Sequence, residues 1–104
     1  MIEYIWIVTT TVETQEQAKT LAKLAVESRL AACAQVDAGI TSHYRWKDKL
    51  EQATEYRIQF KLPMEAKDGL VNWLRKQHPY DCPQILAWKA ESCNPEYTDW
   101  IKQV

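Results

Sequence analysis

One stretch in the middle of the chain alternates apolar and polar side chains with a period of two. The apolar set is Tyr56, Ile58, Phe60 and Leu62, and the polar set between them is Glu55, Arg57, Gln59 and Lys61. Successive side chains of a β-strand point to opposite faces of its sheet. The pattern therefore predicts a strand with one buried and one solvated face, which is typical of an antiparallel sheet.

Elements of both kinds surround this strand. β-Branched and aromatic residues predict a first strand from Tyr4 to Thr10. Thr14 and Gln17 have the spacing of a capping box, and apolar residues at helical spacing then predict a helix to about Leu30. The remaining elements are extended segments at 33–36 and 40–46, a second helix after Pro63 that ends near 77–79, a strand at 84–90, and a short terminal helix begun by Asn94 and Pro95.

The order of these elements predicts an α+β fold. A chain of 104 residues is too short for two autonomous cores, so we expect one domain over residues 1–104. The order βαββαβ is that of a ferredoxin-like sandwich, in which two helices cover one face of a four-stranded antiparallel sheet. A short C-terminal helix is added to that order here.

The second and third strands form a hairpin that is too long for such a sheet. It runs from about Ile40 to Leu62, and the step at 37–39 before it predicts a bulge or a bend. The other strands have about six residues, so this hairpin extends beyond the sheet. An overhanging edge is normally paired or covered, and we therefore expect the chain to oligomerise through the hairpin.

The charge balance argues against two classes of partner. There are 13 Lys and Arg against 14 Asp and Glu, which leaves no general cationic field for nucleic acid. No apolar run approaches the ~20 residues of a membrane span, and the acidic residue near the start does not suit a signal peptide. We expect a cytoplasmic protein that binds neither nucleic acid nor membrane.

The sequence does not predict an enzyme. It contains no G-x-S-x-G, P-loop or H-E-x-x-H pattern, and only His43 and His78 can serve as an imidazole base. Cys33, Cys82 and Cys93 are odd in number and lack C-x-x-C spacing, so they predict reduced thiols rather than disulfides or a structural zinc site. Nothing in the spacing requires a Cys and His pair.

Six short motifs occur in a fixed order along almost the whole chain. They are Thr9-Thr10, the run from Arg29 to Cys33, the run from Ser42 to Trp46, Lys61, the run from His78 to Tyr80, and Tyr97 with Trp100. Together they resemble the CutA-type divalent-cation tolerance proteins. The resemblance implies a ferredoxin-like chain assembled as a tight homotrimer, with hairpins pairing between subunits and clefts at the interfaces.

The same resemblance implies a function. It links the chain to tolerance of copper and other divalent cations. It also implies an architecture similar to PII-type signalling trimers. We expect weak binding of Cu(II) or another divalent ion at inter-subunit clefts, with no organic cofactor. The alternative is a PII-like signalling or scaffold trimer that binds a small metabolite or a partner protein, without direct metal chemistry.

A copper or zinc site needs thiolate, imidazole or carboxylate groups that converge from at least two segments. His78, Asp81 and Cys82 lie within five residues of one another, and Cys33 can approach from another strand or subunit. We take these four as the candidate metal ligands. The alternatives are that Cys33 is a small buried filler, that Cys82 is a loop thiol, and that His78 caps the end of a helix.

Other residues are candidates for a cleft or a subunit interface. They are Tyr44, Trp46, Lys61 and Tyr80. The aromatic residues of the hairpin can be interpreted as a stacking platform for a base, but interface packing explains them more simply. The chain also departs from the family pattern: Gln84 stands where many members carry Glu, which removes a possible hard ligand near His78, and Leu62 follows Lys61 where Thr is usual.

Overall fold

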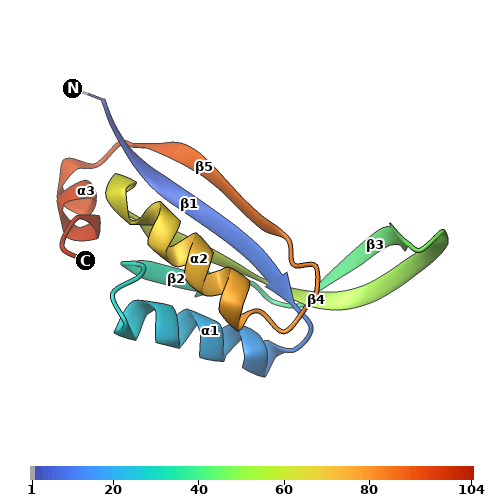
Figure 1. Ribbon diagram of the computed structural model, residues 1–104. Coiled ribbons are helices and arrows are strands. Elements are labelled where there is room, and N and C mark those ends of the chain that lie inside the picture. Colours follow the sequence, from blue (N-terminus) through green and yellow to red (C-terminus); the bar gives the residue numbers. More distant parts are fainter. Residues whose placement is uncertain (1) are drawn as a thin grey trace.

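Two helices cover one face of an antiparallel sheet (Figure 1), in a computed structural model that describes residues 2–104. The elements are β1 (Glu3–Val12), α1 (Gln15–Glu27), β2 (Cys33–Val36), β3 (Ile40–Trp46), β4 (Lys49–Leu62), a 3-10 turn (Met64–Ala66), α2 (Lys67–Gln77), β5 (Ile85–Ser92) and α3 (Pro95–Ile101). The strand order is β2-β4-β1-β5, with β3 paired to the outer part of β4. The predicted ferredoxin-like arrangement is confirmed.

The core lies between the sheet and the two helices. β4 contributes Ile58, Phe60 and Leu62, and α2 contributes Leu70 and Leu74, all with no exposed surface. The alternation in the sequence therefore placed the buried face of β4 correctly, because strand side chains alternate between faces. No helix within residues 2–104 is long and apolar enough to cross a membrane.

The predicted capping box begins α1. The Gln17 amide donates a hydrogen bond to Thr14 Oγ1 at 3.1 Å, and the Thr14 amide donates to Gln17 Oε1 at 3.1 Å. These two bonds satisfy donors that the first turn of a helix otherwise leaves free. The end of β1 lies beside the base of the hairpin because Val12 pairs with Tyr56 of β4.

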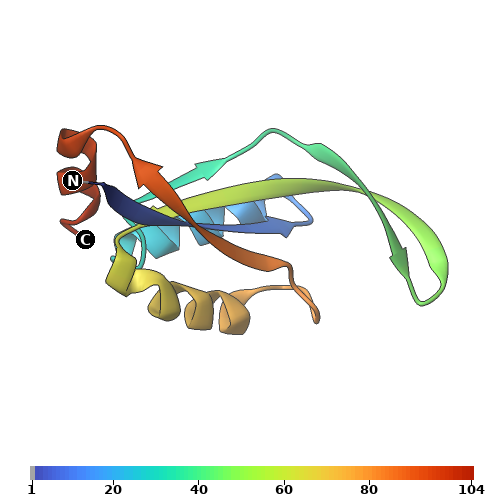
Figure 2. The same ribbon diagram turned by 90° about the horizontal axis from the view of Figure 1, so that it is seen from above.

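The hairpin of β3 and β4 extends beyond the sheet (Figure 2). β4 pairs with β1 only from Tyr56 to Leu62, and its remaining residues pair with β3 alone among the described strands. Between the pairs Val36–Ile58 and Ile40–Glu55, three residues of one strand lie opposite two of the other, which is the predicted bulge. The chain is consequently elongated, with extents of 48 × 25 × 23 Å.

The end of α1 contains a strained residue. Arg29 has a φ of 60°, and the amides of Arg29 and Leu30 bond back to the carbonyls of Val26 and Ala25. This is a Schellman motif, which favours Gly at the residue that takes the left-handed conformation. A side chain there costs free energy because its Cβ crowds the following carbonyl.

We predict that Arg29→Gly raises the free energy of unfolding by about 0.5–1 kcal/mol, since glycine adopts a positive φ without steric cost. Urea-induced unfolding followed by circular dichroism measures the change. Arg29→Ala is the control, because it removes the same long side chain but keeps the Cβ. Equal stability of the two variants would show that backbone strain is not the cause.

Candidate functional site

A cavity of about 620 Å³ lies at the base of the hairpin. Three segments line it: the end of β1 with Thr11 and Glu13; the hairpin with Ser42, His43, Tyr44, Trp46, Ala53, Thr54 and Glu55; and the segment before β5 with Tyr80, Asp81, Cys82 and Gln84. Its volume falls within the range of small-molecule sites, about 300–1,000 Å³. The overhang of the hairpin therefore makes one wall of the cavity.

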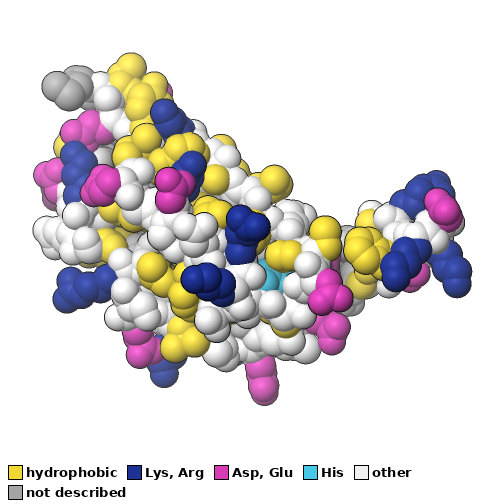
Figure 3. Space-filling view, viewed as in Figure 1, with side chains coloured by type: hydrophobic (Ala, Val, Ile, Leu, Met, Phe, Trp, Pro, Cys, Tyr) yellow, Lys and Arg dark blue, Asp and Glu magenta, His cyan; other side chains and the backbone are white. Residues whose placement is uncertain are grey.

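The ionised side chains that line this cavity are acidic. Glu13, Glu55 and Asp81 are in its lining, and none of the lining residues is Lys or Arg. Acidic side chains also gather at the base of the hairpin in the space-filling view, whereas basic ones gather at its tip (Figure 3). Carboxylates that share one concave surface produce a negative potential that attracts cations.

Tyr80 joins two walls of the cavity. Its hydroxyl donates a hydrogen bond to Glu55 Oε2 at 2.8 Å. Burial first, and then the Glu55 carboxylate, raise the pKa of the Tyr80 phenol well above its usual value; Glu13 acts in the same direction. The Glu13 and Glu55 carboxylates therefore both affect the Tyr80 phenol, although they come from segments far apart in the sequence.

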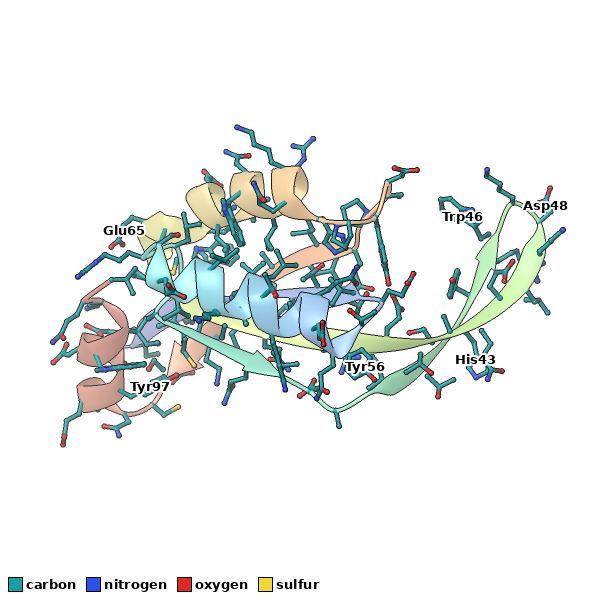
Figure 4. All side chains as sticks on the ribbon, turned by 90° about the horizontal axis from the view of Figure 1, so that it is seen from below. His43, Trp46, Asp48, Tyr56, Glu65 and Tyr97 are labelled. Carbon is teal, nitrogen blue, oxygen red and sulfur yellow. The ribbon has the colours of Figure 1, made fainter. Side chains whose placement is uncertain are left out.

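The hairpin presents its aromatic side chains toward the cavity on one face only. Tyr44 and Trp46 are each about half exposed, at 44% and 49%. Trp46 and His43 extend from opposite sides of the hairpin (Figure 4), as strand alternation requires. The His43 imidazole therefore does not share the face that carries Trp46.

His78 lies beneath the cavity wall and is 8% exposed. Its Nε2 is 3.0 Å from the Thr11 carbonyl oxygen and 2.9 Å from Thr10 Oγ1. Because a carbonyl only accepts, Nε2 carries the hydrogen, and Nδ1 accepts the Tyr80 amide hydrogen at 3.1 Å. Burial lowers the pKa of His78, against smaller opposing effects of the Thr11 hydrogen bond and of Glu55.

The four residues predicted as metal ligands do not meet within this chain. Asp81 and Cys82 reach the cavity, but both ring nitrogens of His78 are already hydrogen bonded, and Cys33 lies on β2 opposite Lys61. Residues 2–104 contain no group of three or more His, Cys, Asp or Glu side chains arranged to hold a metal ion. Any metal site in the cavity would therefore combine Asp81 and Cys82 with ligands outside the predicted set.

The four residues predicted for a cleft or interface lie in two different places. Tyr44, Trp46 and Tyr80 line the cavity, whereas Lys61 lies on the sheet face away from the helices and donates to Gln35 Oε1 at 2.6 Å. Sequence reasoning missed Glu13 and Glu55. Glu55 fits the alternation of a solvated strand face, and Glu13 lies between a strand and a helix, so no local pattern indicates either residue.

The chain matches a family model described as CutA1 divalent ion tolerance protein over residues 6–104. It is 37% identical to the divalent-cation tolerance protein CutA of Thermus thermophilus over 93% of this chain and 94% of that protein. It is also 37% identical to protein CutA of Mus musculus over 86% of this chain, but it spans only 51% of the mouse protein's length.

A solved structure of CutA from Synechococcus elongatus superposes with a TM-score of 0.90 at 38% identity, over 94% of this chain and 87% of that chain. Another structure of that protein, with a TM-score of 0.85, is complexed with a Bis-Tris molecule. Fold and sequence thus define the class of small ferredoxin-like proteins with an extended hairpin. Within that class, the chain belongs to the CutA1 divalent ion tolerance family.

We predict that stability falls as the pH drops below about 6.5, the ordinary pKa of histidine, by up to ~1.4 kcal/mol per pH unit from His78. The folded-state pKa of His78 is below that of the unfolded chain. Below the unfolded value the unfolded chain binds a proton that the folded chain resists, so its stabilisation is lost as the pH falls. Urea unfolding across this range measures the slope.

His78→Gln removes this contribution, and His43→Gln serves as the matched control because His43 is exposed on the hairpin. The slope of His78→Gln should be smaller than that of the wild type, while that of His43→Gln should not. Identical slopes in all three proteins would contradict the buried neutral imidazole.

Proposed function

We propose that the protein acts in the tolerance of, or response to, divalent metal ions, Cu(II) in particular, as a cytoplasmic homotrimer that binds the ion weakly in this cavity. The observation that carries the proposal is the lining: three carboxylates, Glu13, Glu55 and Asp81, with no Lys or Arg among the lining residues. Family membership supports the link to divalent ions.

The donor set is consistent with a weak site for a borderline-soft ion. Carboxylate oxygens suit many divalent ions, and the exposed Cys82 thiol beside Asp81 adds a softer donor. Copper has the highest affinity of the first-row divalent ions for a given set of N, O and S ligands. The ligands come from three separate segments, and their side chains lose conformational entropy when an ion orders them. This cost reduces the binding free energy, so we expect weak binding.

The strand edges support assembly into a ring. In residues 2–104, β3 pairs only with β4 and β5 only with β1, so one edge of each strand has no partner. Each of these two strands also carries an exposed aromatic residue, Trp46 on β3 and Trp88 on β5. Two different edges that pair head to tail generate a closed ring when the rotation permits, and a trimer is the smallest ring beyond a dimer.

The thiols support the proposed compartment. Cys33, Cys82 and Cys93 are all free, and two of them are exposed. Free exposed thiols persist where glutathione and thioredoxin keep cysteines reduced, as they do in the cytoplasm.

We predict that the double variant Glu55→Gln, Asp81→Asn weakens Zn(II) and Cu(II) binding about tenfold or more, because removal of carboxylates from a shared site costs at least ~1.4 kcal/mol. Isothermal titration calorimetry measures the affinities, with Zn(II) as the probe that has no redox chemistry. Glu65→Gln is the control, since Glu65 lies at the far end of the molecule from the hairpin (Figure 4). Unchanged affinity in the double variant would refute the cavity as the site.

We also predict that assembly and folding are lost together. Native mass spectrometry should show a trimer, and thermal unfolding should coincide with its dissociation, because the free edges are paired only in the assembly. Trp88→Arg should shift the population to smaller species, whereas Leu24→Arg, on an exposed position of α1, should not. A folded monomer that persists over a wide range of dilution would contradict the proposal.

A second candidate function is binding of a small organic cation. The volume of the cavity and its aromatic residues Tyr44, Trp46 and Tyr80 favour it, as does the Bis-Tris complex of the Synechococcus relative. The acidic lining disfavours an anionic metabolite such as a nucleotide. Titration with Bis-Tris in place of the metal ion tests this candidate in the same calorimeter.

A further inference from the structure

The segment that forms one wall of the cavity is held at both ends by side chains. The Tyr80 amide donates to His78 Nδ1 at 3.1 Å, and the Gln84 carbonyl oxygen accepts from Thr10 Oγ1 at 2.7 Å. Between these two points lie Asp81 and Cys82, which the proposed function places at the ion. Residues 79–84 are neither helix nor strand, so no regular backbone ladder sets their conformation.

The two ends are joined to each other through one pair of side chains. The one hydrogen on His78 Nε2 is shared between two acceptors, Thr10 Oγ1 at 2.9 Å and the Thr11 carbonyl oxygen at 3.0 Å. The Thr10 hydroxyl accepts a hydrogen bond from the imidazole. It donates its own hydrogen bond to the Gln84 carbonyl oxygen, which can only accept. The directions of all these bonds agree for a single neutral tautomer of His78, with the hydrogen on Nε2.

This chain of bonds is anchored in the core. Thr10 has no exposed surface and lies on β1, which is the strand between β4 and β5. Buried hydrogen bonds are costly to leave unmade, so the pair resists rearrangement. Tyr80 then extends the connection to the opposite wall through its hydrogen bond with Glu55.

We propose that His78 and Thr10 form a clamp that positions the 80–84 wall of the cavity, and that His78 is a positioning residue rather than a metal ligand. The proposal deepens the proposed function and rests on it for the identity of the bound ion. The clamp itself, however, is a property of the folded chain. It assigns Thr10 and the His-Pro-Tyr run to one hydrogen-bonded network, although Thr10 and His78 are 68 residues apart in the sequence.

Amide hydrogen exchange with Zn(II) calorimetry tests the clamp. Thr10→Val keeps the shape of the side chain but removes both hydrogen bonds, and Thr10→Ser keeps the hydroxyl as the matched control. In Thr10→Val we expect protection of the Tyr80 amide against exchange to fall about tenfold, which is the effect of losing one ordinary buried hydrogen bond. We expect the Zn(II) affinity to fall by a similar factor. Thr10→Ser should retain both. His78→Gln should lose protection of the same amide.

Outcomes separate the clamp from the proposed function. If the Tyr80 amide is equally protected in the wild type, Thr10→Val and His78→Gln, the clamp is overturned whatever the ion does. If protection falls as expected but the wild type binds no divalent ion, the clamp stands and the proposed function fails. If protection falls while Zn(II) affinity is unchanged, the clamp does not position the site and this inference is wrong.

A measurement on the wild type covers the case in which the variants do not fold. Nitrogen chemical shifts of isotope-labelled histidine should show, near neutral pH, that Nε2 of His78 carries the hydrogen and that Nδ1 is an acceptor. The opposite tautomer, or a charged ring, would overturn the clamp, because Nδ1 could not then accept the Tyr80 amide.

Discussion

The whole arrangement depends on β4 being a single strand of 14 residues. Its inner part is a central strand of the sheet and buries Ile58, Phe60 and Leu62 under the helices. Its outer part pairs with β3 and has no support from β1. Because the backbone is continuous, the packed core holds the hairpin in a fixed direction. The hairpin in turn supplies one wall of the cavity, so core packing determines the geometry of a surface site.

The bulge at 37–39 interrupts the pairing with β4 for only three residues and so allows this geometry. One extra residue bends the strand and increases its twist, and pairing with β4 resumes at Ile40. The bend directs Tyr44, Trp46 and Glu55 toward the segment that precedes β5. Aromatic and acidic side chains of the hairpin thus face a wall that a different part of the chain builds, and the clamp at His78 holds that wall in place.

The sequence groups candidate site residues that are neighbours in the chain, but it does not indicate residues that meet only in the fold. Asp81 and Cys82 were recognised because they follow one another in a short loop. Glu55 was interpreted as part of a solvated face, since alternation shows only which side of a strand a residue is on. The sequence offers His78 as a candidate metal ligand because it records an imidazole but not the hydrogen bonds that engage its two nitrogens in the fold.

The sequence by itself determined the order of strands and helices, the buried face of β4, the cap of α1 and the position of the bulge, because each follows from local periodicity or from short-range hydrogen bonding. The family resemblance was also visible in the sequence, as motifs in a fixed order. Only the tertiary structure decided which carboxylates share a cavity and which bonds engage His78. Those contacts join residues from β1, the hairpin and the segment before β5, and their distances depend on packing among all three.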